Sequence, residues 1–582
     1  MIELRFANYF SNHMVLQGSP HKPVIWGYGP KPTDYKNISV IVRLYMFDSS
    51  KQSIATKQHT NVLTTEASVK DDSLSKYLAE VEPEYRYTSQ VQRAAAGNTW
   101  RVTLEPPTHK GPYLITASLI GQSEDQVIKL RDVMFGDVWV CTGHDRGLDR
   151  LNKIANFTDS DNTNINEGDD GDEDDLRIFS VFPAKSDVPW PDIHLYDIPW
   201  TIASKSKAPR IRDRSGSYSP IFPGPCWHFG HKLRRHLKRP LGLISAIYNE
   251  NLPEEWLPSQ ALNVSEKTYL ESSSRNWNGM IHPLLDVQIR GVIFQQGDAF
   301  EDDDRDQKEK EKKEKSKKSS SDYRYFFKKF THHWRMGVRS RTQPHSSASG
   351  GGDSNDESNL NNDDTPLILF GIIQALPNNN SQSKSLATAS NRWRATANRG
   401  YLPNSDLDST FLAVSIDLPD MEDIRQKQKL GERLLRGAVH VAYHEKVEHK
   451  GPTPFEYVNV KKKDLTLNFN TNIIVKSDFG FEICCSKTPR NQTCKGPEDK
   501  AAGFYWDHVI VTSSTNKSVT LNTENCPWHT VGFRYAWADE PCEFESCPVY
   551  SVRTNLPMPS LIHLHMLDDG KPKKLHLDLV DV

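Results

Sequence analysis

The sequence of 582 residues has no long hydrophobic run and almost no net charge. No segment approaches the roughly 18 uninterrupted apolar residues that a membrane-spanning helix needs, so we expect no membrane span. The formal net charge is −3, and this balance does not point to nucleic acid or to an anionic membrane surface. We therefore expect a soluble chain, and its length predicts about three or four domains.

The sequence as given also lacks a signal peptide, because Met1 to Phe6 contain no basic segment followed by an apolar stretch. Its cysteines argue for an oxidising compartment all the same. A small disulfide framework is typical of secreted chains, and six of the eight cysteines lie close together, namely Cys484, Cys485, Cys494, Cys526, Cys542 and Cys547. A zinc site is the alternative, although the sequence has no Cys-x-x-Cys pair. We expect a secreted or lysosomal glycoprotein whose true start lies upstream of Met1, with a cytosolic chain as the alternative.

The hydrophobic pattern changes twice along the chain. Short alternating runs separated by Pro and Gly predict a β-sandwich-like domain over 1–130. Residues 131–450 alternate continuous apolar runs with helical patterns, which predicts a parallel sheet with helices on both faces. Short strands return in 451–582, the cysteine-rich β region. The predicted strands of the middle domain are 135–141, 176–182, 241–247, 291–295, 366–374 and 411–418.

Four polar tracts interrupt the middle domain. They cannot bury enough apolar surface to offset the entropy of ordering, so we predict that they are mobile surface insertions. They cover 159–175, 301–320, 345–364 and 377–390.

One run of the middle domain ends in a glycine turn. Residues 135–143 indicate a buried strand that ends at Gly143, and His144 and Asp145 then follow at the exposed tip. In an open parallel sheet, ligands bind at the carboxyl ends of the strands. A serine at such a tip could be activated by a histidine, but this chain has Asp145.

Several multi-residue runs resemble the sialate O-acetylesterases, in the same order and over nearly the whole chain. They are Arg5-Phe6-Ala7, Met14 to Gln17, Val133 to Cys141, Trp277 to Leu284, Phe533 to Trp537, and the pattern from Pro541-Cys542 to Cys547-Pro548. The resemblance implies a flavodoxin-like SGNH hydrolase core flanked by β regions. It also implies a secreted or lysosomal protein of carbohydrate metabolism that removes O-acetyl groups from sialic acids. In that reaction a serine attacks the acetyl carbonyl and a histidine takes its proton.

Compared position by position, the family's motifs are altered here. Gly-Gln-Ser-Asn-Met, which carries the nucleophile, corresponds to residues 143–147, with Asp145 in place of the serine. A Trp-Gly-Gly-Thr turn corresponds to residues 248–251, so Asn249 and Glu250 replace two glycines and restrict the backbone. Gln-Gly-Glu-Ser-Asn corresponds to residues 296–300 and keeps Gln296, with Asp298 as a shorter acid.

The family's base lies in Ser-Ile-His-Pro-Arg-Asp-Lys, which corresponds to residues 421–427 and has Asp423 in place of the histidine. Nucleophile, base and glycine turn are thus lost together. We expect a homologue without serine-esterase activity that retains sialylated glycans as partners, without cofactor or metal. The alternative is an active O-acetylesterase that uses non-standard residues. Asp145 could act as the nucleophile with His440 or His444 as base, or Asp145, Asp298 and Asp423 could form an acidic cluster.

Overall fold

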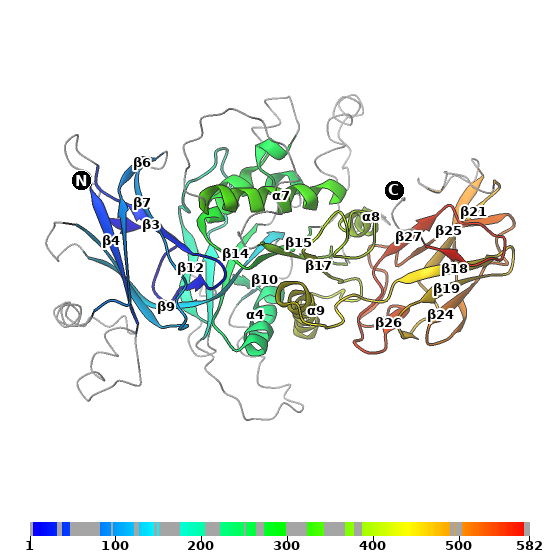
Figure 1. The fold of residues 1–582 in the computed structure, drawn as a ribbon. Helices are drawn as coiled ribbons and strands as arrows, with labels where there is room; N and C mark the ends of the chain where they lie inside the picture. Colours follow the sequence, from blue (N-terminus) through cyan, green and yellow to red (C-terminus); the bar gives the residue numbers. More distant parts are fainter. Residues whose placement is uncertain are drawn as a thin grey trace, which may run out of the picture.

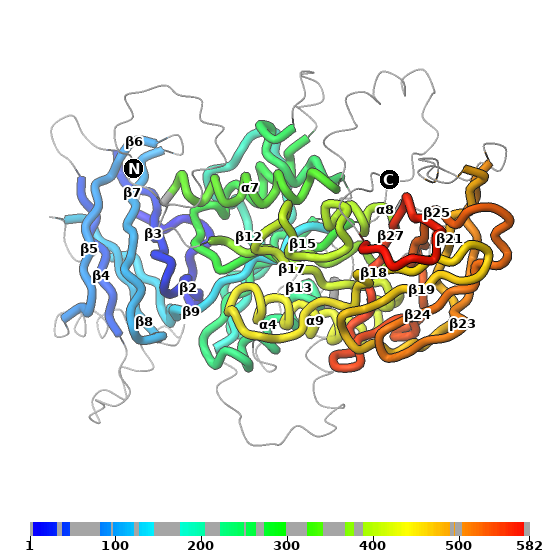
Figure 2. The backbone as a smooth tube through the Cα atoms, turned by 45° about the vertical axis from the view of Figure 1, so that its right-hand side comes forward, coloured from blue at the N-terminus to red at the C-terminus, as the bar shows by residue number. Residues whose placement is uncertain are grey.

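A computed structural model describes residues 4–31, 38–46, 82–94, 97–120, 127–144, 148–150, 175–203, 221–248, 252–262, 273–297, 323–342, 367–377, 387–488, 494 and 503–575. Three regions follow one another in a row (Figures 1 and 2), with an N-terminal β region at one end, an α/β region in the middle and a second β region at the other end. No helix of this described part is long and apolar enough to cross a membrane.

The N-terminal region shares a strand with the middle region. β9 (Ile128–His144) pairs with β8 in its first half and with the parallel strands in its second half, so the boundary expected at residue 130 lies inside one strand. A separate four-stranded sheet has the order β1-β3-β7-β6. The strands before β9 are β1 (Arg5–Phe6), β2 (Val15–Gln17), β3 (Val24–Tyr28), β4 (Ser39–Met46), β5 (Tyr85–Gln90), β6 (Gln92–Ala94), β7 (Gly97–Thr103) and β8 (Tyr113–Leu119).

The middle region is built on a parallel sheet, which confirms the predicted α/β class. Its strand order is β11-β14-β9-β15-β16-β17, with β12 antiparallel at the edge. After β9 the strands are β10 (Leu148–Arg150), β11 (Leu176–Val181), β12 (Tyr196–Ile202), β13 (Ile221–Pro223), β14 (Leu241–Tyr248), β15 (Gly291–Gln295), β16 (Leu369–Ile373) and β17 (Thr410–Ala413). The helices are α4 (Gly224–Leu237), the short turns η4 (Pro253–Trp256), η5 (Ser259–Ala261), η6 (Trp277–Ile281) and η7 (His282–Asp286), then α7 (Tyr323–Thr342), α8 (Ala387–Arg394) and α9 (Ile424–Tyr443).

Helices cover both faces of this sheet. Figure 1 shows α7 on one side and the packed pair α4 and α9 on the other. Alternate residues of β9 serve the two faces, because Val138 and Val140 join one hydrophobic cluster and Trp139 and Cys141 join another. A strand buried on both faces explains why its sequence is a continuous apolar run.

The C-terminal region is all β. Its sheets have the orders β23-β24-β19-β18-β28, β22-β21-β25-β27 and β20-β26. The strands are β18 (Pro454–Val460), β19 (Asp464–Phe469), β20 (Ile473–Val475), β21 (Phe481–Ser486), β22 (Phe504–Val509), β23 (Val511–Ser514), β24 (Ser518–Asn522), β25 (His529–Tyr535), β26 (Val549–Ser551), β27 (Leu561–Leu564) and β28 (Lys573–Lys574).

All eight cysteines form disulfides, so the predicted framework is confirmed. The six C-terminal cysteines pair as Cys484–Cys494, Cys485–Cys526 and Cys542–Cys547. A fourth bond, Cys141–Cys226, joins β9 to α4. No sequence pattern pairs these two residues, which lie 85 positions apart.

Two predicted ranges need correction. The strand expected over 411–418 ends at Ala413, because the residues after it turn away to make buried side-chain contacts. The tract 377–390 is not an insertion throughout, since 387–390 begin α8, where Thr388 and Ala389 are buried. The tracts 301–320 and 345–364, and 159–174 of the first tract, lie outside the described residues.

Candidate functional site

The candidate site lies at the carboxyl ends of the parallel strands, where the chain changes direction across the sheet. From β9 the chain runs through β11 to β14 on one side, and it then crosses to β15, β16 and β17 on the other side. Gly143 stands in register with Ile247 of β14 and with Gln295 of β15. Ligands of open α/β sheets bind at such a switch point.

The prediction that the strand ends at Gly143 and exposes His144 is wrong, because β9 continues to His144, which pairs with Tyr248 and is buried. The left-handed backbone expected at Gly143 is present. Its φ is +101°, in the left-handed region that favours glycine. A Cβ atom at this position would lie 2.3 Å from the carbonyl oxygen of Gln295. Only glycine fits there, because a side chain would force β9 and β15 apart.

Four of the predicted site residues lie outside the described part of the chain. They follow the described ends of β9, β14 and β15 in sequence, and they are Asp145, Asn249, Glu250 and Asp298. The structure does describe Gln296 and Asp423, together with polar residues after β16 and β17 that the motifs did not indicate.

Gln296 is buried, and both ends of its amide are engaged. Its Nε2 donates to the carbonyl of Asn391 at 3.0 Å, and its Oε1 accepts from the backbone N–H of Ala375 at 3.0 Å. The side chain therefore ties the end of β15 to the end of β16 and to α8. This amide holds the strand ends in place.

The segment after β17 turns inward, and this explains why the strand is short. The Ser415 hydroxyl donates to the carbonyl of Gln374 at 3.0 Å. Asp417, with none of its side chain exposed, receives Arg433 of α9 at 2.6 and 2.8 Å and the hydroxyl of Tyr550 at 3.0 Å. A buried ion pair in which both carboxylate oxygens accept hydrogen bonds avoids part of the cost of desolvated charge. It fixes the strand end against α9 and the C-terminal region.

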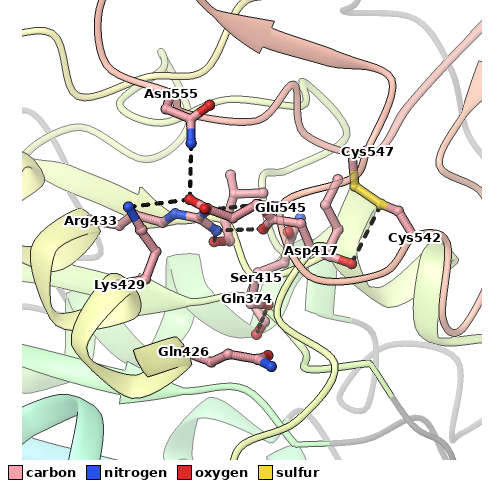
Figure 3. Close-up of polar contacts among 12 residues, drawn as sticks. Gln374, Ser415, Asp417, Gln426, Lys429, Arg433, Cys542, Glu545, Cys547 and Asn555 are labelled. Carbon is pink, nitrogen blue, oxygen red and sulfur yellow. Dashed lines mark hydrogen bonds and ion pairs between the residues drawn. A yellow bond between two sulfur atoms is a disulfide. The ribbon is translucent and has the colours of Figure 1, made fainter. Parts of the chain in front are cut away.

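A disulfide-closed loop of the C-terminal region, Cys542–Cys547, rests on this segment (Figure 3). Cys542 Sγ contacts the carbonyl of Ile416 at 3.8 Å, and the backbone N–H of Glu545 donates to the carbonyl of Asp417 at 3.2 Å. The Glu545 carboxylate pairs with Lys429 of α9 at 3.2 Å. The C-terminal region thus contacts the chain segment that leads to Asp423.

Asp423, which the sequence motifs assign to the family's base position as a prediction, caps the N-terminus of α9. Its carboxylate accepts from the backbone N–H of Arg425 at 2.9 Å and pairs with the guanidinium of the same residue at 2.7 Å. The hydrogen bond from Arg425 is the main reason that the pKa of Asp423 lies below its ordinary value. A carboxylate that is held ionised in this way is a poor proton acceptor at neutral pH.

The two histidines considered as substitute bases lie at the wrong edge of the sheet. Tyr443, the last residue of α9, donates its hydroxyl to Asp137 at 2.8 Å. Asp137 precedes Gly143 by six positions on β9, so the end of α9 is about 20 Å from the site. His440 lies on this last turn, where its Nδ1 hydrogen-bonds the carbonyl of Glu445 and its ring stacks on His449. His440 and His444, the C-cap of α9, therefore both lie far from Gly143.

Comparison with known proteins finds similarity to sialate O-acetylesterases in sequence and to a carbohydrate acetylesterase in structure. The family described as "Sialate O-acetylesterase C-terminal domain" matches residues 455–565. The human (Homo sapiens) and mouse (Mus musculus) sialate O-acetylesterases are each 26% identical over 96% of this chain, and the match covers 92% and 94% of those proteins. A crystal structure of a carbohydrate acetylesterase from Xanthomonas citri superposes with a TM-score of 0.61 at 17% identity, covering 96% of this chain and 99% of that one. That likeness shows a shared fold.

Proposed function

Because the chain belongs to the sialate O-acetylesterase family, we propose that it is a homologue that has lost the serine-esterase reaction. In this proposal the core is of the SGNH hydrolase type. The carboxyl ends of the parallel strands form a pocket that binds sialylated glycans without hydrolysing their O-acetyl esters.

The state of Asp423 is the observation that carries this proposal. Acyl transfer needs a base that accepts the proton of the nucleophile and returns it to the leaving group. Asp423 instead caps a helix and pairs with Arg425. A carboxylate whose pKa is lowered by these contacts is a weak acceptor for the nucleophile's proton.

The nucleophile position supports the same conclusion from chemistry alone. A carboxylate at Asp145 has no proton to lose, so the activation that serves a serine does not apply to it. Its negative charge would also oppose the oxyanion that forms during acyl transfer. The side chains at Asn249 and Glu250 stand where the family has two glycines, so a close backbone approach to the substrate is restricted there.

One observation favours the alternative of an active O-acetylesterase with non-standard residues. The scaffold of the site is intact, since Gly143 keeps its left-handed turn and Gln296 still braces the strand ends. Asp145 would then attack the acetyl carbonyl itself, the ester bond to the sugar oxygen would break and that oxygen would take a proton from water, and a second water would hydrolyse the mixed anhydride to acetate. The proposal and this alternative differ in one measurable product, which is free acetate.

The test of activity follows acetate release from 9-O-acetylated sialic acid and from a chromogenic acetate ester. We expect no turnover above the uncatalysed rate by the parent protein. Turnover by the parent that is abolished in Asp145→Ala would overturn the proposal in favour of the alternative.

Variants that carry the family's residues at the altered positions provide a stricter test. Asp145→Ser alone should remain inactive because the base and the glycine turn are still missing. A variant that combines Asp145→Ser, Asp423→His, Asn249→Gly and Glu250→Gly should release acetate at a rate above the parent. Hydrolysis by the single serine variant would show that the base has been misplaced.

Binding is tested separately from catalysis. Calorimetric titration with a 9-O-acetylated sialoside should give a saturable signal, and lactose, which lacks the sialic acid, should give none. An equal response to the two sugars, or a response to neither, would remove the glycan-binding role and leave only the fold shared with the family.

The compartment is part of the proposal. Four disulfides are present, one of them buried in the α/β region and three in the C-terminal region. Disulfides of this kind persist in secreted and lysosomal proteins and are rare in the reducing cytosol. We therefore place the protein in the secretory pathway, and localisation of a tagged full-length product tests this.

A further inference from the structure

The hairpin between β23 and β24 exposes an asparagine in a sequence that accepts N-linked glycans. The acceptor pattern is Asn-x-Ser/Thr, where x is any residue except Pro, and Asn516-Lys517-Ser518 matches it. Thr515 precedes the match, and we call residues 515–518 the acceptor turn. It connects two strands of the C-terminal β region (Figure 2), which also holds three of the four disulfides.

The pattern alone decides little, because short patterns of this kind also arise by chance in a chain with many asparagines. It occurs at Asn37, Asn156, Asn263, Asn379, Asn491 and Asn516. The first five asparagines lie outside the described residues. Asn516 lies within them, so its surroundings can be compared with what an attached glycan requires.

The backbone of the acceptor turn is fixed to its neighbours. The carbonyl of Asn516 accepts a hydrogen bond from the N–H of Ile473, the first residue of β20, at 2.8 Å. The carbonyl of Lys517 accepts from the N–H of Phe469, the last residue of β19, also at 2.8 Å. Both bonds use main-chain atoms, so they hold the turn in place and do not involve the side chain of Asn516.

The side chain of Asn516 is exposed and makes no hydrogen bond to another described residue. The side-chain hydrogen bonds of the turn come from two hydroxyl groups instead. The hydroxyls of Thr515 and Ser518 lie 2.7 Å apart, and the Thr515 hydroxyl accepts from the backbone N–H of Lys517 at 3.1 Å. The turn therefore keeps its shape without the Asn516 amide, and a substituent on the amide nitrogen breaks no contact among the described residues.

Asn459 shows the opposite situation in the same region. It is 1% exposed, and its Nδ2 donates to the carbonyl of Thr530 at 2.9 Å. A sugar on that nitrogen would have to enter the packed interior and displace the hydrogen bond, which would leave a buried carbonyl unsatisfied. A glycan on Asn516 meets neither obstacle, because a bulky polar group projects into solvent from an exposed turn.

Glycan attachment also needs the right compartment and donor. N-linked glycans are added in the lumen of the endoplasmic reticulum, where disulfides form as well. The donor is an oligosaccharide joined through its C1 atom to a lipid-linked diphosphate. The amide nitrogen of Asn516 forms a bond to C1, the C1–O bond breaks, the lipid diphosphate leaves with the electron pair of that bond, and the nitrogen loses one proton to solvent. The protein thus supplies only the amide nitrogen, which is free in the acceptor turn.

We propose that Asn516 is an N-glycosylation site. The proposal rests on the secretory compartment inferred above, but it does not depend on glycan binding at the strand ends or on the loss of esterase activity. The attached sugar lies on a turn that the hydrogen bonds from β19 and β20 hold in place. Modification therefore leaves the fold unchanged and adds a polar group to the surface of the C-terminal β region.

The first experiment expresses the full chain in human cells behind a supplied signal peptide. Enzymatic release of N-linked glycans in heavy-oxygen water converts each glycosylated asparagine to aspartate that carries the heavy oxygen, and peptide mass spectrometry locates this label. We expect the label at position 516, and an unlabelled Asn516 would overturn the site. Because the signal peptide is supplied, that result would not bear on the native compartment, which localisation of the native product tests by itself.

Variants separate the acceptor pattern from a general effect of substitution. Asn516→Gln and Ser518→Ala should each lose the label at this position together with one glycan, seen as a single step in electrophoretic mobility. Ser518→Thr keeps the hydroxyl and should retain the label. Asn472→Gln, a change at an exposed asparagine outside the pattern, should retain it as well. A label that persists at Asn516 in Ser518→Ala, or that disappears in Asn472→Gln, would contradict the assignment.

Glycan transfer takes place on the nascent chain, so a variant that fails to fold still reports its occupancy in the cell extract. Exposure of the acceptor turn has a readout of its own. The glycosidase should release the Asn516 glycan from the folded, unreduced protein as completely as from the denatured protein. Release only after denaturation would contradict the exposed position of this turn.

Discussion

Gly143 shows how one residue can control the geometry of the site. Its backbone is left-handed, and its missing side chain makes room for the carbonyl of Gln295. Gly97 shares the first property but not the second, because its φ is +115° and a Cβ atom there would have no neighbour within 4 Å among the described residues. Comparing alanine substitutions at Gly97 and at Gly143 therefore separates the cost of backbone strain from the cost of steric overlap.

Replacement of Gly143 by alanine should destabilise the protein more than the same change at Gly97. We expect about 1–2 kcal/mol at Gly97 from the left-handed backbone, and about 1–3 kcal/mol more at Gly143 from the clash with β15. Unfolding in urea, followed by fluorescence, measures both. Equal losses would show that β15 moves aside without cost.

At the residue scale, sequence motifs pointed to the special backbone of Gly143, because that is a local pattern, while the assignment of Asp423 to the base position stays a prediction. They did not reveal the contacts of Asp417. Its partners Arg433 and Tyr550 lie 16 and 133 positions away, and no spacing along the chain indicates such a contact. The same holds for the bond between Cys141 and Cys226.

At the scale of elements, α4 and α9 pack closely because a glycine lies at their crossing. A Cβ atom on Gly431 of α9 would lie 2.7 Å from Cβ of His228 and 2.9 Å from the backbone nitrogen of Phe229. Gly337 of α7 offers a contrast, since its Cβ would meet the end of a flexible side chain, Cδ1 of Leu285, at 2.8 Å.

Gly431→Ala should therefore lower the free energy of unfolding, although alanine is the better helix former by about 1 kcal/mol. Overpacking against another helix backbone costs about 1–3 kcal/mol, which exceeds that gain. Gly337→Ala should be close to neutral, because Leu285 can change its rotamer. Chemical unfolding of the two variants measures the difference, and a stabilised Gly431→Ala would contradict the close packing.

The strands of the middle region were predictable because continuous apolar runs mark strands buried on both faces. β11, β14 and β15 agree with the predicted ranges to within one residue. The run at 411–418 overshoots β17, since apolar residues at Val414 and Ile416 continue beyond the strand. Burial by tertiary contacts and burial in a strand look alike in sequence.

At the scale of the whole molecule, burial of neutral histidines makes the fold sensitive to acid. Burial is the main reason that four histidines have a pKa of about 4, and these are His21, His228, His333 and His449. The unfolded chain takes up protons near a pKa of 6.5. Between these two values the unfolded state binds more protons than the folded state.

The free energy of unfolding should therefore be highest above pH 6.5 and should fall as the pH drops from 6.5 toward 4. His228 is 7% exposed, and its interval of roughly 2.5 pKa units at 1.36 kcal/mol each limits its share to about 3 kcal/mol. The His228→Gln variant should show a flatter loss of stability than the parent over this range, measured as the unfolding midpoint from pH 7 to pH 4.5. His508→Gln, a change at a side chain that is 87% exposed, should follow the parent. A parent unfolding midpoint that stays constant down to pH 5 would contradict this prediction and would show that water reaches these imidazoles in the folded state. Such a fold would remain stable at the acidic pH of the lysosome.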